Sequence, residues 1–114
     1  MSSNFALKIH ALLCRPYLKG RDWYDFNWYV KHRVQPNLPH LQAALLQLGP
    51  WKNERITVDM DWLRHAMMEK IASVDWNEAA MDVERFLKPA EQQSLRLWRE
   101  RFFESKVESL MRRG

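Results

Sequence analysis

The chain has 114 residues, of which 46% are hydrophobic and 28% are charged, a balance typical of one globular domain and not of a disordered chain. The single cysteine, Cys14, excludes an internal disulfide, and no stretch approaches the roughly 18 consecutive apolar residues that a membrane span requires. The first residues do not resemble a signal peptide, so we expect a cytoplasmic protein with no membrane partner. Residues 1–55 hold eight Lys and Arg against three Asp and Glu, which permits a phosphate-rich partner there.

Apolar residues recur at helical spacing between short segments that contain Pro or Gly. Only three glycines occur, which disfavours a β protein with many tight turns. The one strand-like run, residues 56–58, is too short to define a sheet. We therefore predict an all-α fold, a compact bundle of about six helices in a single domain of residues 1–114. The expected helices cover 4–14, 21–33, 37–48, 57–74, 75–87 and 89–112.

The expected helix starts carry residues that cap helices. Asn37 and Asp75 precede two of them, and Glu78 completes a capping box with Asp75. Thr57 is the predicted cap of the fourth helix, and Pro89 occupies the first turn of the sixth. A helical apolar stripe favours one continuous last helix. This stripe contains Leu95, Trp98, Phe102, Phe103, Val107 and Leu110.

Charged residues align on the first two expected helices. Lys8 and Arg15 are seven residues apart and share a helix face, as do Asp22 and Asp25, three residues apart. The connector between the helices is short, so we expect antiparallel neighbours with the cations opposite the carboxylates. Two interpretations remain open: a cleft that handles phosphate, or an interhelical ion-pair network beside an aromatic core.

Other polar and aromatic groups give weaker indications of a functional site than the charged residues of the first two helices. Asp59 and Asp61 are interpreted as acids that stabilise a helix start, not as metal ligands. The four histidines have no ligand spacing, so we expect no metal site. The aromatic run 23–29 precedes the basic residues 31–33 and is capable of stacking nucleobases. We interpret most of these rings as core.

Two segments resemble a known family. Phe5-Ala6-Leu7-Lys8-Ile9-His10-Ala11-Leu12-Leu13 and Lys19-Gly20-Arg21-Asp22-Trp23-Tyr24-Asp25-Phe26 look like the third and fourth signature segments of the AbiEii/AbiGii nucleotidyltransferase toxins. Members of that family act in type IV toxin–antitoxin and phage-defence systems. Their fold joins a polymerase-β-like nucleotidyltransferase domain to a C-terminal helical domain. The likeness continues through Asn37-Leu38-Pro39 and Gly49-Pro50-Trp51, so this chain is similar to the C-terminal helical domain.

The resemblance implies roles for particular residues. Lys8 matches the nucleotide-handling lysine, Asp22 matches the catalytic aspartate, and Asp25 matches a secondary acid. With them we expect three cations to bind nucleotide or phosphate: Arg15, Lys19 and Arg21. The family enzymes use Mg²⁺ and an NTP, but we expect this chain to bind neither alone.

The chain also departs from the family pattern. Family enzymes have a Gly-Ser turn and an Asp-x-Asp pair on a sheet, whereas no glycine occurs here before Gly20. We therefore expect a truncated or split member that is inactive alone and needs a separate N-terminal nucleotidyltransferase half. An antitoxin protein and RNA are further expected partners. The alternatives are a helical interaction module without chemistry, or a structural protein that forms homo-oligomers.

Overall fold

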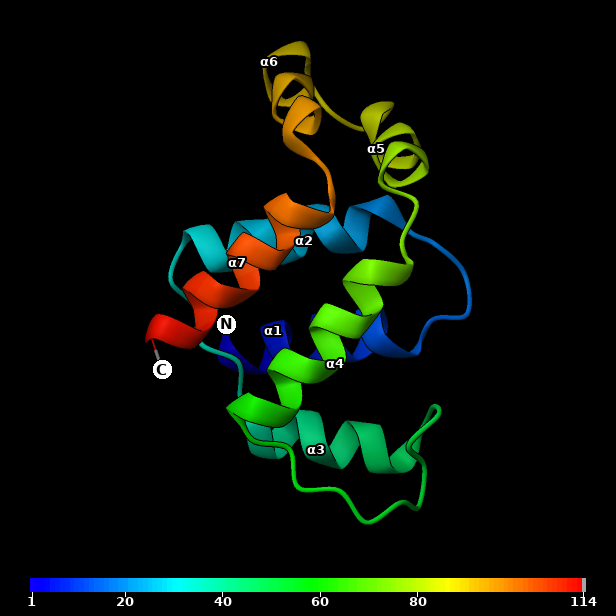
Figure 1. Ribbon diagram of the computed structural model, residues 1–114, viewed down its shortest axis with the longest axis vertical. Coiled ribbons are helices and arrows are strands. Elements are labelled where there is room, and N and C mark those ends of the chain that lie inside the picture. Colours follow the sequence, from blue (N-terminus) through cyan, green and yellow to red (C-terminus); the bar gives the residue numbers. More distant parts are fainter. Residues whose placement is uncertain (114) are drawn as a thin grey trace.

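Helices form nearly all of the regular structure in the computed structural model, which describes residues 1–113 (Figure 1). They are α1 (Ser2–Cys14), α2 (Gly20–Lys31), α3 (Leu38–Gln47), α4 (Met60–Ser73), α5 (Trp76–Glu84), α6 (Pro89–Gln92), the 3-10 helix η1 (Gln93–Leu97) and α7 (Glu100–Arg113). No strand occurs within residues 1–113. The all-α prediction is therefore confirmed, although the number of helices is larger than the six predicted.

The helices are arranged along a molecule of 43 × 29 × 23 Å. Figure 1 shows α3 at one end, α5 and α6 at the other, and α1, α2, α4 and α7 between them. Helix α1 packs against α2, α3 and α4, while α2 also packs against α5 and α7. The central position of α1 and α2 holds the charged residues of the first two helices against the core.

The aromatic residues of four helices meet in this core. Trp23 of α2 lies edge-on to Trp76 of α5, with 5.0 Å between ring centroids, and to Phe103 of α7 at 5.3 Å. Trp76 and Phe103 stack at 4.3 Å, and Phe5 of α1 packs on Phe26. These five side chains are buried. Aromatic pairs of this kind contribute about 0.5–1.5 kcal/mol each beyond their buried area.

The prediction of one continuous helix over 89–112 is wrong. The chain passes from α6 into η1 and then through Trp98, whose extended backbone (φ −69°, ψ 110°) separates η1 from α7. Trp98 is buried against Trp76 and Phe103, at centroid distances of 6.3 and 5.1 Å. The bend allows α7 to pack on α2 and α4, while the Gln92 amide of α6 donates to the Glu84 carbonyl at the end of α5. Apolar spacing did not reveal the break because residues of the apolar stripe are buried both before it and after it.

Two other boundaries differ from the prediction by more than two residues. The fourth helix begins at Met60 and not near Thr57, because the Val58 N–H donates to Oε1 of Gln42 (2.8 Å) and holds this segment outside the helix. Asp59 is the actual cap, and its carboxylate accepts the Trp62 N–H at 2.8 Å. This contact confirms Asp59 as an acid that stabilises a helix start. The fifth helix ends at residue 84, not 87.

The predicted caps at Asn37 and Asp75 are confirmed. Asn37 accepts the His40 N–H at 3.0 Å, and Asp75 accepts the Glu78 N–H at 3.1 Å. Because both bonds satisfy N–H groups that a helix start leaves unpaired, they fix where α3 and α5 begin.

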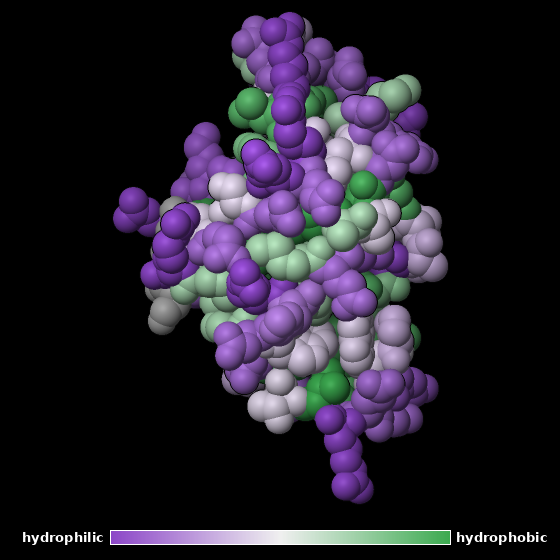
Figure 2. Space-filling view, viewed as in Figure 1, coloured by the Kyte–Doolittle hydropathy of each residue, from purple (hydrophilic) through white to green (hydrophobic). Residues whose placement is uncertain are grey.

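Hydrophilic residues cover most of the face shown in Figure 2, and hydrophobic side chains appear there in small separate groups. Several large hydrophobic side chains are exposed on the surface. They include Tyr17, Leu48, Met81, Phe86 and Leu97. Within residues 1–113, no helix combines the length and apolar character needed to cross a membrane.

Candidate functional site

The charged residues of α1 and α2 meet around one buried carboxylate. Lys8 Nζ lies 2.9 Å from Oδ1 of Asp22 and 3.0 Å from Oδ2 of Asp25. The Asp22 side chain is 2% exposed, compared with 22% for Lys8 and 31% for Asp25. The expected opposition of cations and carboxylates across two antiparallel helices is therefore present.

Arg15 reaches the other oxygen of the same carboxylate. It is the C-cap residue of α1, and its Nε lies 2.7 Å from Oδ2 of Asp22. The Nε–H does not point along this line, so the contact is an ion pair and not a well-directed hydrogen bond. Arg15 Nη1 also donates to the hydroxyl of Tyr17 at 2.8 Å. Both oxygens of Asp22 thus contact a cation.

The start of α2 places Asp22 by packing closely on α5. The Gly20 N–H donates to Oδ2 of Asp82 at 2.8 Å. A Cβ at Gly20 would lie 2.1 Å from the Ala79 carbonyl oxygen, well inside contact distance. Only glycine allows this approach without movement of the backbone. Asp22 follows in the first turn of α2, where the helix dipole also favours a carboxylate.

The surroundings keep both cations charged. Burial lowers the pKa of Lys8, but hydrogen bonds and charge from Asp22 and Asp25 outweigh it and raise the pKa above its ordinary value. The pKa of the Arg15 guanidinium is also raised, mainly by its hydrogen bond to Tyr17. Lys8 therefore serves as a fixed positive charge and not as a proton acceptor.

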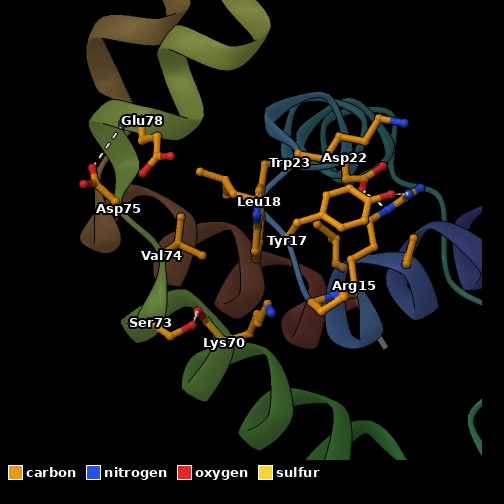
Figure 3. A pocket seen from close by; sticks show the side chains of 14 residues that line it. Arg15, Tyr17, Leu18, Asp22, Trp23, Lys70, Ser73, Val74, Asp75 and Glu78 are labelled. Atoms are coloured by element: carbon orange, nitrogen blue, oxygen red, sulfur yellow. Dashed lines mark hydrogen bonds and ion pairs between the residues drawn. The ribbon is translucent and has the colours of Figure 1, made fainter. Parts of the chain in front are cut away.

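A cleft of about 270 Å³ opens beside Arg15 and Asp22. Figure 3 shows Arg15, Tyr17 and Asp22 on one side and Asp75 and Glu78 of the α5 start on the other. The lining has three cations and three carboxylates, so its charge is balanced. These charged residues are Arg15, Lys19, Lys70, Asp22, Asp75 and Glu78.

The structure groups only part of the predicted site. Arg15 and Lys19 line the cleft with Asp22, whereas Lys8 contacts Asp22 from outside the cleft lining. Arg21 is exposed and lines a separate hollow. Sequence reasoning missed two groups that line the cleft, the Tyr17 hydroxyl and Lys70 of α4. Tyr17 was recognisable by its place between two basic residues, but Lys70 had no local signal because only packing brings α4 here.

The interpretation of most rings in the run 23–29 as core is confirmed. Trp23 and Phe26 are buried, and Tyr29 stacks on Phe5 with 4.8 Å between ring centroids. Trp28 is the exception, since it is 39% exposed and stacks on His32 at 4.0 Å.

The carboxylates present do not fit a magnesium ion as they stand. Mg²⁺ binds carboxylate oxygens, and both oxygens of Asp22 and one of Asp25 contact cations. Among the described residues 1–113, no group of three or more His, Cys, Asp or Glu side chains is arranged to hold a metal. Arg15, Lys19 and Lys70 line the same cleft, where Asp22, Asp75 and Glu78 balance their charge.

Comparison with known proteins identifies one family. The family described as "Nucleotidyl transferase AbiEii toxin, Type IV TA system" matches residues 2–106, which include both helices of the site and the cleft lining. No curated protein and no solved structure matches the chain significantly.

Proposed function

Because the chain belongs to the AbiEii nucleotidyltransferase toxin family of type IV toxin–antitoxin systems, we propose that it supplies a half-site for NTP-dependent nucleotidyl transfer. In this proposal, a separate polymerase-β-like segment supplies the Gly-Ser turn and the Asp-x-Asp pair that bind nucleotide and metal. Without that segment, the chain is inactive in this proposal. An antitoxin is its proposed partner in the toxin–antitoxin system.

The observation that supports the half-site most strongly is the pairing of Asp22 with two cations. A carboxylate that is 2% exposed and held at 2.9 and 2.7 Å from Lys8 and Arg15 fixes both positive charges in place. Preorganised cations stabilise the negative charge that develops during phosphoryl transfer, because they need no reorganisation at the moment of reaction. Asp22 is thus a positioning residue for Lys8 and Arg15 in the geometry described.

Asp25 has the remaining capacity for proton transfer. Its Oδ2 contacts Lys8, whereas its Oδ1 has no polar partner within residues 1–113, and the side chain is 31% exposed. In the transfer step, an acceptor hydroxyl oxygen bonds to the α-phosphorus of the NTP, and the bond to pyrophosphate breaks. The hydroxyl proton passes to Asp25, while Lys8 and Arg15 hold the negative phosphate oxygens.

A transfer assay tests this function. The purified chain is incubated with Mg²⁺, each of the four labelled NTPs and bulk tRNA, beside the Asp22→Asn and Asp25→Asn variants. We expect no label transfer by the chain alone. Transfer by the wild-type chain that is lost in the variants would overturn the proposed inactivity and would assign the reaction to this chain.

A binding measurement tests the half-site itself. We expect millimolar NTP without metal to shift the NMR signal of the Lys8 side-chain ammonium, and the Lys8→Met variant to lack that signal. Lys106→Met is the matched control, since Lys106 lies on α7 and its ammonium is placed over the Phe102 ring. If NTP shifts the signals of Lys8 and Lys106 alike, binding is non-specific and the half-site proposal is wrong.

A second function, an interaction module, is favoured by exposed apolar groups at one end of the molecule. Met81 of α5, Phe86 just after α5, and Leu97 of η1 are 71%, 59% and 56% exposed. Such groups favour contact with a protein partner or a second copy of the chain. A constant monomer mass by light scattering up to about 100 µM would argue against homo-oligomers.

A further inference from the structure

Beside the cleft at Asp22 lies a second hollow of about 490 Å³. It is formed by the connection from α1 to α2 and by the end of α5, and Tyr17, Leu18 and Lys19 border both hollows. Its other lining residues are Arg21, Asp82, Arg85 and Phe86. The two hollows are therefore neighbours on one surface.

The second hollow combines two exposed rings with basic side chains. Tyr17 and Phe86 are 60% and 59% exposed. Each ring has a guanidinium beside it, Arg15 at 5.7 Å from the Tyr17 centroid and Arg85 at 4.9 Å from the Phe86 centroid. Exposed rings that alternate with cations are typical of surfaces on which unpaired bases stack, because every base has a π face.

The cations of the hollow are available to an anion. Lys19, Arg21 and Arg85 form no ion pair within residues 1–113. The one acid in the lining, Asp82, already accepts the Gly20 N–H at 2.8 Å. Three cations and one carboxylate leave a local charge of +2, in contrast to the balanced cleft at Asp22. A phosphate backbone is attracted to this hollow by charge.

We propose that this hollow binds a segment of single-stranded RNA, with bases on Tyr17 and Phe86 and phosphates at Lys19, Arg21 and Arg85. A duplex fits less well because its bases are stacked inside and not open to aromatic side chains. Tyr17 accepts a hydrogen bond from Arg15, which also contacts Asp22, so a strand in the hollow lies beside the candidate site. Use of this strand as the acceptor rests on the proposed function, whereas its binding does not.

Fluorescence anisotropy with a labelled 12-nucleotide single-stranded RNA tests the binding without any transfer reaction. We expect the Tyr17→Ser/Phe86→Ser variant to bind at least about tenfold more weakly, because stacking on one ring contributes roughly a factor of ten. The matched control is Leu48→Ser, which removes an exposed hydrophobic side chain (66% exposed) just after α3, at the other end of the molecule. This control is expected to bind like the wild type.

A charge series tests the phosphate contacts. Arg21→Gln/Arg85→Gln is expected to weaken binding and to lower the slope of log Kd against log salt by about 1.4, since each lost phosphate contact in a single strand accounts for about 0.7. Arg99→Gln/Arg101→Gln removes the same charge from exposed positions at the start of α7 and serves as control.

Four outcomes would overturn the proposal. Two concern the wild type: no RNA binding at about 100 µM protein, and equal affinity for the single strand and for a hairpin duplex of the same RNA. The third is that polyglutamate displaces the labelled RNA as well as unlabelled single-stranded RNA does, and the fourth is that the test and control variants weaken binding equally. An equal NTP response of Lys8 and Lys106 together with intact RNA binding would contradict only the proposed function. Loss of RNA binding together with an NTP response specific to Lys8 would contradict only this surface.

Discussion

Substitution of Asp22 by asparagine tests whether the site is a buried ion-pair network. The Asp22→Asn change keeps the size of the side chain but removes the negative charge between Lys8 and Arg15. Removal of one partner from a fully buried pair lowers the free energy of unfolding by about 3–5 kcal/mol. Lys8 and Arg15 are 22% and 30% exposed and remain partly hydrated, so we expect about 2–3 kcal/mol.

Asp25→Asn is the matched control, because Asp25 contacts the same lysine but is 31% exposed. An exposed pair contributes about 0.2–1 kcal/mol, so the control should lose less than about 1 kcal/mol. A domain of this size loses about 4 °C in melting temperature per kcal/mol. The melting temperature should therefore fall by about 8–12 °C in Asp22→Asn and by less than about 4 °C in Asp25→Asn.

Urea unfolding followed by tryptophan fluorescence provides the measurement, because Trp23 and Trp76 lie in the core. The midpoints of the wild type and both variants give the two changes in free energy if their m values agree. Equal losses in Asp22→Asn and Asp25→Asn, within about 0.5 kcal/mol, would refute the reasoning, since burial is what distinguishes the two carboxylates.

Two local contacts and two ionisations give further predictions. Replacing glycine by alanine in a helix ordinarily raises the free energy of unfolding by roughly 1 kcal/mol. Gly20→Ala should instead lower it by more than that amount, because the new Cβ would lie 2.1 Å from the Ala79 carbonyl oxygen. Urea unfolding measures the change, and a more stable variant would contradict the contact. Asp59→Ala should lower it by about 1 kcal/mol through loss of a helix cap, whereas Asp59→Ser should restore most of that loss in the same assay. Burial raises the pKa of the Cys14 thiol, so iodoacetamide at pH 8 should modify it more slowly in the folded protein than in urea, and equal rates would show an open thiol. The pKa of Lys8 is raised above 10.5, so its stabilising contribution should be constant below that pH and fall as the pH rises through the folded-state pKa; a wild-type advantage over Lys8→Met that grows at alkaline pH would contradict this sign.

The parts of the fold that depend on neighbouring residues could be predicted from the sequence. Asn37 and Asp75 cap the helices they were expected to cap, because capping needs only the next three residues. The approach of Lys8 to Asp22 also followed from local features, namely helical spacing and a short connector. Such features act over one or two helical turns and are visible in the sequence.

Features that depend on packing between distant segments could not be predicted. The extended backbone at Trp98 exists because its ring packs on Trp76, which belongs to α5, an earlier helix of the chain. Lys70 reaches the cleft at Asp22 only because α4 packs against α1. The sequence resemblance drew attention to Lys8 and Asp22 as candidate residues, but it did not show that both Asp22 oxygens contact cations. That arrangement requires the end of α1 to meet the start of α2.

The close approach at Gly20 restricts which second mutations are able to restore a damaged chain. The atom nearest to an added Cβ is the carbonyl oxygen of Ala79, which belongs to the backbone. Every amino acid carries this oxygen, so no replacement of the Ala79 side chain removes the clash. A suppressor of Gly20→Ala must therefore move α5 as a whole, and random mutagenesis should recover suppressors in the segments that anchor α5 and not at position 79 itself.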